Sequence, residues 1–204
     1  MSTIRMRAAV LALTGVGAAA LVACGSSLTA GAGPARSSSP SAEQALGAIV
    51  RLAAERVMTA DTVAAAKWGT VQPIDDPSRE KTVLDRAASQ AAKLGIDRAT
   101  VQRIFKDQIA ANKDVQRALY AQWQEHPAEQ PTRRPDLATQ VRPVLDRVDN
   151  QLLTAIRQAQ PLLSRPACDA LIERGKATTV QAMSLDAIHR SGLDQALAHT
   201  CPAR

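Results

Sequence analysis

The sequence predicts an all-α fold: a single helical-bundle domain of about six helices. Few of its residues favour strands, because Phe, Tyr and Trp together make up 2% of a chain rich in Ala, Leu, Gln and Arg. Apolar residues recur at steps of three and four along most of the chain, which is the spacing of one helical face. A length of 204 residues allows one domain with a substantial core.

The N-terminal segment is expected to lie outside that domain, with residues 1–23 as a signal peptide. Arg5 and Arg7 form a basic start, residues 8–22 are apolar, and Cys24 follows directly. This pattern is typical of a secretory signal peptide and is too short for a membrane-spanning helix. Its ending resembles a bacterial lipobox, in which the cysteine becomes the lipidated first residue; the alternative is an ordinary alanine-rich cleavage site. We expect an exported protein of the periplasm or cell envelope, lipid-anchored to a membrane.

The segment after the signal peptide is expected to be a flexible linker over residues 24–42, followed by the folded domain over 43–204. Gly, Ser, Pro and Ala dominate this linker, and that composition is typical of a flexible tether.

Start and stop signals divide the domain into helices. The first helix is expected over 42–70. Asp76 followed by Pro77 predicts the start of the second helix, because an acidic N-cap and a proline at the first helical position favour helix initiation. Gly95 predicts its end, since glycine readily adopts the left-handed conformation of a C-terminal cap. A third helix is expected over 97–123, again with an aspartate cap at its start.

Proline residues set the limits of the fourth helix. It follows a proline-rich loop over 126–135, begins near Asp136 and runs toward Leu163. Pro161 and Pro166 are expected to end it, because proline removes a backbone donor and clashes with the preceding turn.

The C-terminal region is expected to hold two shorter helices, over 168–184 and 185–199. If Cys24 is lipidated, Cys168 and Cys201 remain as an even pair in an oxidising compartment, which favours a disulfide between them. Two free thiols are the alternative. The three histidines have no metal-ligand spacing with either cysteine, so no metal site is expected.

The charge balance favours a small anionic ligand over a nucleic acid. The formal net charge is +6, and loss of the two arginines of the signal peptide lowers it to +4. The chain has no run of lysines and only four aromatic side chains on which bases could stack. A few arginines that hold a small anion account better for this modest excess.

Polar residues occupy positions where helical periodicity predicts the core. Buried polar groups need partners, so faces of this kind that converge would make a polar cavity inside the bundle, where ligand sites are often built. Each residue also has a structural reading, such as a helix cap, a solvated first turn, a buried amide pair or a cation that reaches solvent from the edge of the stripe. In chain order the candidates are Arg56, Lys67, Asp76, Arg79, Glu80, Asn112, Gln116 and Arg142.

The candidate set contains four cations, two acids and two neutral amides. It lacks a nucleophile, a base poised near neutral pH and a metal cluster, so it is unsuited to hydrolysis or acid–base chemistry. It suits an anionic ligand with separate carboxylates, a hydroxyl and a neutral oxygen acceptor, because arginine binds carboxylates with two parallel hydrogen bonds.

Four segments resemble the AroQ class of all-helical chorismate mutases: LAAERVMTADTVAAAKW, IDDPSREKTVLDRA, FKDQIAANKDVQ and VRPVLDRVDNQLL. Together with the signal peptide and the late cysteine pair, they are similar to the exported, gamma subclass, and the resemblance covers about residues 43–204. It implies an isomerase of aromatic amino acid biosynthesis, the shikimate pathway, that rearranges chorismate to prephenate. It implies no cofactor, no metal and no covalent intermediate.

The resemblance also implies roles for the candidates. Two residues would donate hydrogen bonds to the ether oxygen of the substrate, arginines would hold its carboxylates, and acidic residues would lie near its hydroxyl. The implied catalytic residues are Lys67, Gln116, Arg56 and Glu80, and the implied substrate-binding residues are these four with Asp76, Arg79, Asn112 and Arg142.

The expected partners follow from the same resemblance. They are the small-molecule substrate chorismate and, through a lipid on Cys24 alone, a membrane; no nucleic acid is expected. One chain would supply a complete site, and a homodimer is compatible with the sequence. The alternative to an enzyme is a non-catalytic exported helical module that binds a carboxylate ligand or a partner.

Overall fold

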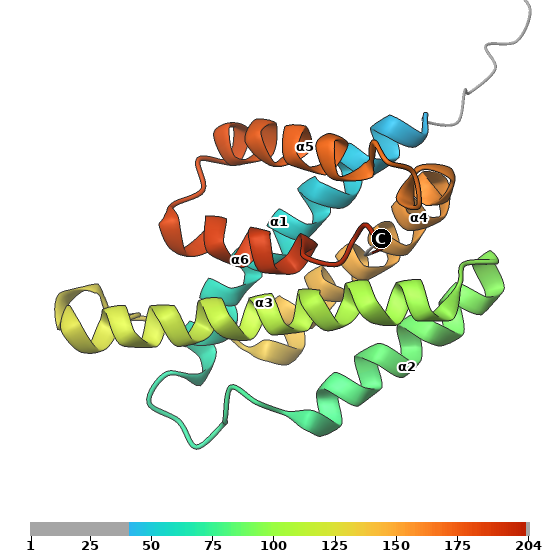
Figure 1. Ribbon diagram of the computed structural model, residues 1–204. Helices are drawn as coiled ribbons and strands as arrows, with labels where there is room; N and C mark the ends of the chain where they lie inside the picture. Colours follow the sequence, from blue (N-terminus) through green and yellow to red (C-terminus); the bar gives the residue numbers. More distant parts are fainter. Residues whose placement is uncertain (1–40, 203–204) are drawn as a thin grey trace, which may run out of the picture. The chain divides into compact units, whose positions relative to one another are not determined.

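Six α-helices form the part of the chain that the structure, a computed structural model, describes, residues 41–202 (Figure 1). This part contains no strand, and the predicted all-α fold is confirmed. Within it, no helix combines the length and the apolar character needed to cross a membrane. The predicted signal peptide and Cys24 lie outside the described residues. The elements are α1 (Ala42–Lys67), α2 (Pro77–Leu94), α3 (Arg98–Glu125), the short turns Pro127–Glu129 and Leu137–Val141, α4 (Arg142–Leu163), α5 (Cys168–Met183) and α6 (Ala187–Leu197).

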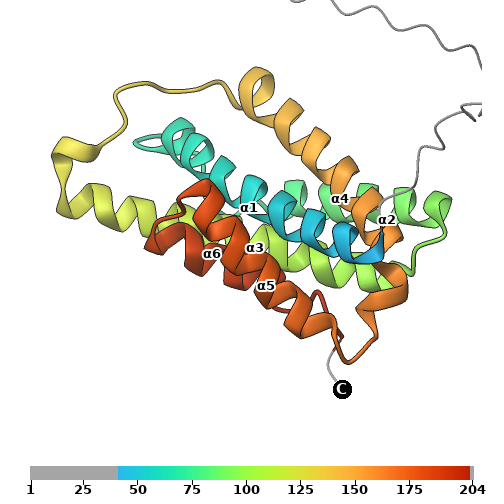
Figure 2. The same cartoon turned by 90° about the horizontal axis from the view of Figure 1, so that it is seen from above.

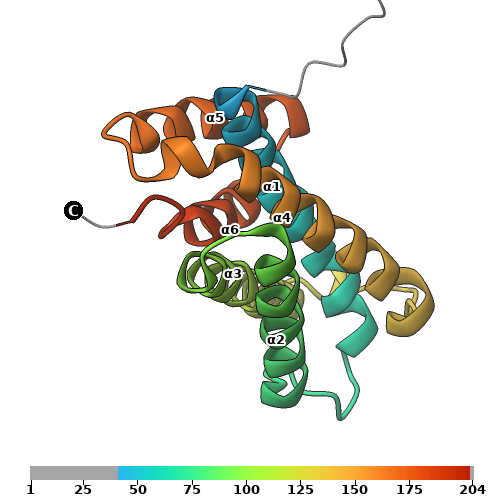
Figure 3. The same cartoon turned by 90° about the vertical axis from the view of Figure 1, so that its right-hand side faces the viewer.

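Helix α1 is the centre of the bundle. It packs against α3, α4, α5 and α6, while α2 packs on α3 and α4 (Figure 2). Helices α5 and α2 lie on opposite sides of α1 (Figure 3). The core is aliphatic, with fully buried side chains such as Ile49, Ile104 and Leu152. Each of these contributes about 1.5–3 kcal/mol through burial, so packing of amphipathic faces stabilises the helices.

The predicted start and stop signals operate at most helix ends. The side chain of Asp76 accepts a hydrogen bond from the backbone N–H of Arg79 at 2.9 Å, and Pro77 is the first residue of α2. Gly95 ends α2 in the left-handed conformation with φ of 67°. Asp97 caps α3 in the same way, by accepting from the N–H of Thr100. These ends are therefore encoded locally.

The first helix is shorter than predicted. It ends at Lys67 and not at Thr70, because Trp68 leaves the helical conformation with ψ of 128°. The Trp68 ring packs edge-on against Tyr120, with ring centroids 4.8 Å apart, and against Trp123. Gly69 follows with φ of 66°, so a left-handed glycine and the packing of the Trp68 ring on α3 together mark the end of α1.

The fourth helix ends at Leu163, as predicted, but it differs from prediction at its start and in the effect of Pro161. A π-helical turn, Leu137–Val141, follows the cap at Asp136, and the regular helix α4 begins only at Arg142. Pro161 does not end α4, which continues to Leu163. A proline this close to the end removes a single hydrogen bond of the last turns, and the burial of Leu163 compensates for that loss.

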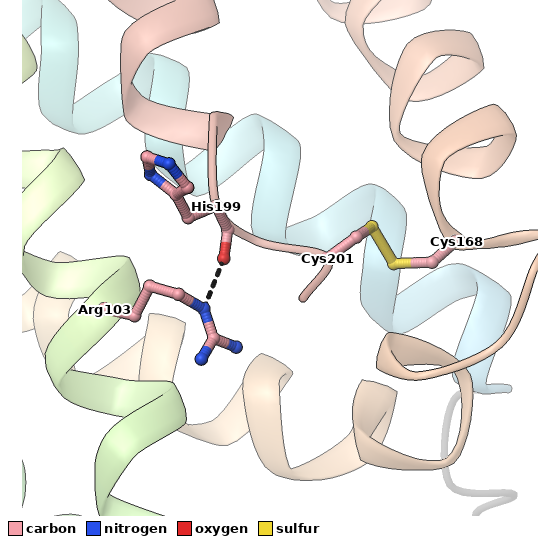
Figure 4. Close-up of a disulfide and its surroundings, with 4 residues drawn as sticks. All are labelled: Arg103, Cys168, His199 and Cys201. Carbon is pink, nitrogen blue, oxygen red and sulfur yellow. Dashed lines mark hydrogen bonds between the residues drawn. A yellow bond between two sulfur atoms is a disulfide. The ribbon is translucent and has the colours of Figure 1, made fainter. Parts of the chain in front are cut away.

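The C-terminus is fixed to the bundle by a disulfide, as predicted. Cys168 and Cys201 are bonded, with their Cα atoms 6.0 Å apart. Beside the bond, Arg103 Nε donates to the carbonyl oxygen of His199 at 2.8 Å (Figure 4). By the chain-entropy relation, closing a loop of 33 residues contributes about 3–4 kcal/mol to stability. The alternative of two free thiols is wrong.

Candidate active site

A cavity of about 800 Å³ opens among α1, α2, α3 and the start of α4. Its position follows from the fold, since the polar faces of these four elements converge at the C-terminal half of α1. All eight predicted site residues line it, namely Arg56, Lys67, Asp76, Arg79, Glu80, Asn112, Gln116 and Arg142.

Arg56 is the most deeply placed cation of the cavity, with 4% of its surface exposed. Its Nε donates to Asp149 Oδ1 at 2.9 Å, and its Nη1 donates to the backbone carbonyl of Gln108 at 2.8 Å. A buried charge needs such partners. Arg56 therefore does not extend from the apolar face of α1 to solvent, and its guanidinium is held at the wall of the cavity.

Lys67 stands at the mouth of the cavity, at the last position of α1. Its ammonium donates to the carbonyl oxygens of Pro73 and Ile74, at 2.8 and 3.3 Å, and so ties back the loop between α1 and α2. Burial lowers the pKa of Lys67, and the nearby acids, Asp76 first, oppose this shift. An ammonium has three donors, so one remains for a ligand.

Asn112 and Gln116 form a buried amide pair, as the structural reading of these residues proposed. Asn112 Nδ2 donates to the carbonyl oxygen of Arg56 at 3.0 Å, and Gln116 Nε2 donates to Asn112 Oδ1 at 2.9 Å. A second, longer bond of 3.3 Å joins Gln116 Nε2 to the carbonyl oxygen of Asn112. A donor bond from Gln116 to a ligand would replace this weaker bond.

The acidic side of the cavity is paired with a lysine. Lys113 Nζ donates to Glu80 at 2.9 Å and to Asp75 at 3.0 Å. Burial alone would lower the pKa of Lys113, but its bonds to Glu80 and Asp75 raise it. Asp76 acts as the N-cap of α2 and also lines the cavity, so it can serve as a helix cap and face a ligand at the same time.

Two arginines differ from Arg56 in having no fixed partner. Within residues 41–202, the guanidinium groups of Arg79 and Arg142 make no hydrogen bond or ion pair with another side chain. Arg79 is half-buried and Arg142 is exposed. Their donors are therefore available to anionic groups in the cavity.

Sequence reasoning missed five charged residues of the cavity wall as site candidates, namely Lys113, Arg134, Asp136, Asp146 and Asp149. Asp149 lies seven residues after Arg142 on the same face of α4, so helical periodicity could have found it. Lys113 follows Asn112 directly and gave no periodic signal. Arg134 lies in the loop before α4, where its Nη2 donates to the Trp68 carbonyl at 3.3 Å, and no pattern marks it.

Comparison with known proteins places these features in a family context. Residues 47–117 match the family described as chorismate mutase type II. The chain is 35% identical over 158 residues to the secreted chorismate mutase of Mycobacterium tuberculosis, covering 78% of the chain and 79% of that protein. It is 33% identical over 153 residues to the secreted chorismate mutase of Mycolicibacterium smegmatis, covering 75% of the chain and 84% of that protein.

Solved structures show the same similarity. The crystal structure of chorismate mutase from Burkholderia phymatum matches with a TM-score of 0.74 and 36% identity, over 79% of the chain and 99% of that structure. Secreted chorismate mutase from Yersinia pestis matches with a TM-score of 0.56 and 22% identity, over 74% of the chain and 94% of that structure, a likeness of fold alone.

Proposed function

The chain belongs to the chorismate mutase family, which makes it an isomerase, and we propose that it rearranges chorismate to prephenate in the cavity described above. The reaction is an intramolecular Claisen rearrangement, in which the ether C–O bond breaks as a new C–C bond forms. Such a reaction needs the reactive conformer to be held and the charge that develops on the ether oxygen to be stabilised. A cavity with four cationic site residues and several further polar groups supports this chemistry.

The arginines are proposed to bind the two carboxylates of the substrate. Arg56 and Arg142 each hold one carboxylate, with Arg79 assisting. Guanidinium groups form paired, charge-assisted hydrogen bonds with carboxylates, and these fix orientation as well as affinity. The buried, doubly anchored Arg56 supplies a rigid contact, while Arg79 and Arg142 can adjust to the ligand.

Lys67 and Gln116 are proposed to stabilise the transition state. Both would donate to the ether oxygen, on which negative charge increases as the bond breaks. Lys67 keeps one donor beyond its two bonds to the loop, and Gln116 has a weak bond to exchange. A single donor of this kind typically contributes about 2.7–4 kcal/mol to transition-state stabilisation.

The remaining candidates are proposed to orient the ring. Glu80 would accept from the ring hydroxyl, with Asp76 nearby. Asn112 lines the cavity and holds the backbone of α1 through the Arg56 carbonyl. All these residues come from one chain, so a complete site needs no second copy.

The convergence of eight candidates from four helices on one cavity is the observation that carries this proposal. The purified chain should consume chorismate, followed by its ultraviolet absorbance, far above the uncatalysed rate. Chorismate binding measured by calorimetry without any turnover would instead favour a non-catalytic exported module that binds a carboxylate ligand.

The chain is exported, and its finer location is part of the proposal. We propose that residues 1–23 are a signal peptide and that Cys24 carries the lipid that anchors the mature protein to a membrane in the periplasm. Intact mass of the membrane-extracted protein should show acylation at Cys24; an unmodified N-terminus elsewhere would remove the anchor. Light scattering on the same sample tests the homodimer that the sequence allows.

A further inference from the structure

The best-anchored group of the cavity is the Arg56 guanidinium, and its anchor is a residue with no role so far. A guanidinium is planar and carries five N–H donors. Two donors on different nitrogens are already bound, one to Asp149 and one to the backbone carbonyl of Gln108. Two bonds at separate points of a rigid plane fix both its tilt and its rotation.

The donors that remain are those that a carboxylate uses. With Nε bound to Asp149, both N–H groups of Nη2 and one of Nη1 are left over. Because Nε–H is taken, the side-on pair of Nε and Nη2 is blocked, and a carboxylate is left with donors of Nη1 and Nη2. The arrangement of partners therefore selects which edge of Arg56 meets the ligand.

The contacts of Asp149 indicate one role, which is to hold the Arg56 guanidinium. It lies on α4, 93 residues from Arg56, and its side chain is 17% exposed. Its hydrogen bonding to the residues described by the structure is confined to Arg56. A carboxylate on the wall of a cavity for a dianion would repel the ligand unless a cation neutralises it. The ion pair provides this neutralisation.

We infer that Asp149 is a positioning residue, which orients the Arg56 fork toward a substrate carboxylate without touching the substrate. The inference rests on the proposed function for the identity of the ligand. The competing hypothesis is that Asp149 binds Arg56 in place of the substrate carboxylate, so that the two carboxylates compete for the same guanidinium. The two readings predict opposite effects on substrate affinity.

The variants Asp149→Ala and Asp149→Asn separate these readings. Asp149→Ala removes the acceptor for Arg56 Nε, and KM for chorismate should rise on the order of 10²-fold, because a misplaced clamp loses geometry. Asp149→Asn keeps an oxygen that accepts from Nε, so it should recover most of that loss. In both variants kcat should change much less than KM, since a carboxylate clamp binds ground and transition states alike.

Arg147→Ala is the matched control. Arg147 joins the same two helices by its ion pair with Glu55, on the solvent side of α4. Loss of this pair should leave KM unchanged, which shows that a general weakening of the α1–α4 contact does not mimic the loss of Asp149.

A second measurement keeps the inference separate from the mutase activity. The Arg56 Nε–H should exchange slowly with water in NMR spectra of the wild type and Asp149→Asn, and rapidly in Asp149→Ala. If the wild type does not turn over chorismate, the proposed function fails while this exchange still decides the positioning. If Asp149→Ala does not fold, Asp149→Asn decides. An unchanged KM in Asp149→Ala, a KM in Asp149→Asn below that of the wild type, or rapid Nε–H exchange in Asp149→Asn would overturn the inference.

Discussion

The cavity and the C-terminal end of the bundle are held together by different means. Around the cavity, charged side chains are paired through hydrogen bonds that can open, and several keep donors for a ligand. At the C-terminal end, formed by α5, α6 and residues 198–202, a covalent bond and a buried histidine fix the chain. The difference indicates a division of labour, in which the cavity provides binding and chemistry and the C-terminal end provides stability.

The largest effect should come from Lys67→Ala. Removal of a donor to the ether oxygen should lower kcat about 10²–10³-fold. The free energy of unfolding should change little, since Lys67 is half-buried and donates only to loop carbonyls. Lys176→Ala is the control, because Lys176 is a half-buried lysine of the C-terminal end that pairs with Asp194. If both variants lost the same amount of activity, the proposed division between a catalytic cavity and a stabilising C-terminal end would be wrong.

Removal of the disulfide should have the converse effect. Cys168→Ser combined with Cys201→Ser should lower the free energy of unfolding by about 3–4 kcal/mol, because the unfolded chain regains the entropy of an open loop. At temperatures where the variant stays folded, kcat and KM should equal those of the wild type. Urea titration with an activity assay on the same samples measures the free energy of unfolding and the kinetic constants. A lower kcat would show that the C-terminal end also affects catalysis in the cavity.

A smaller effect concerns His189, which joins α6 to α1. Its Nε2 lies 2.9 Å from Asp61 and its Nδ1 lies 2.8 Å from Asp186. The bond to Asp61 is the main reason that the pKa of His189 rises to about 9 from 6.5, and the bond to Asp186 adds to it against the effect of burial. The folded state therefore binds a proton more tightly than the unfolded state does.

The raised pKa of His189 makes the stability of the fold depend on pH. This contribution is complete below pH 6.5 and is lost as the pH rises through about 9. Both aspartates are about half exposed or more, so screening reduces it to about 1 kcal/mol. The free energy of unfolding of the wild type minus that of His189→Gln should thus shrink between pH 6.5 and 9. A difference that grows over this range would contradict the assignment.

The two regions also differ in how far the sequence predicts them. Helix caps such as Asp76 and Gly95 act over a few residues, so local sequence reveals them. The disulfide was predictable because only two cysteines remain in the exported domain. Asp149 pairs with Arg56 across 93 residues, and the Trp68 ring packs on Tyr120 and Trp123 of α3. Such pairings depend on how helices cross, which no local pattern contains.

The smallest expected effect is the response of catalysis to pH between 5 and 8. An amide donates at every pH, so the contribution of Gln116 to kcat should be flat over this range. At higher pH, kcat should fall as the Lys67 ammonium loses its proton, because deprotonation removes a donor to the ether oxygen. Burial lowers the pKa of this ammonium from 10.5. The variant Gln116→Glu should instead lose activity as the pH rises, since a carboxyl group donates only when protonated. A steep decline of wild-type kcat between pH 5 and 8 that disappears in a variant of Gln116 would refute this role and shift the transition-state contact to another residue of the cavity.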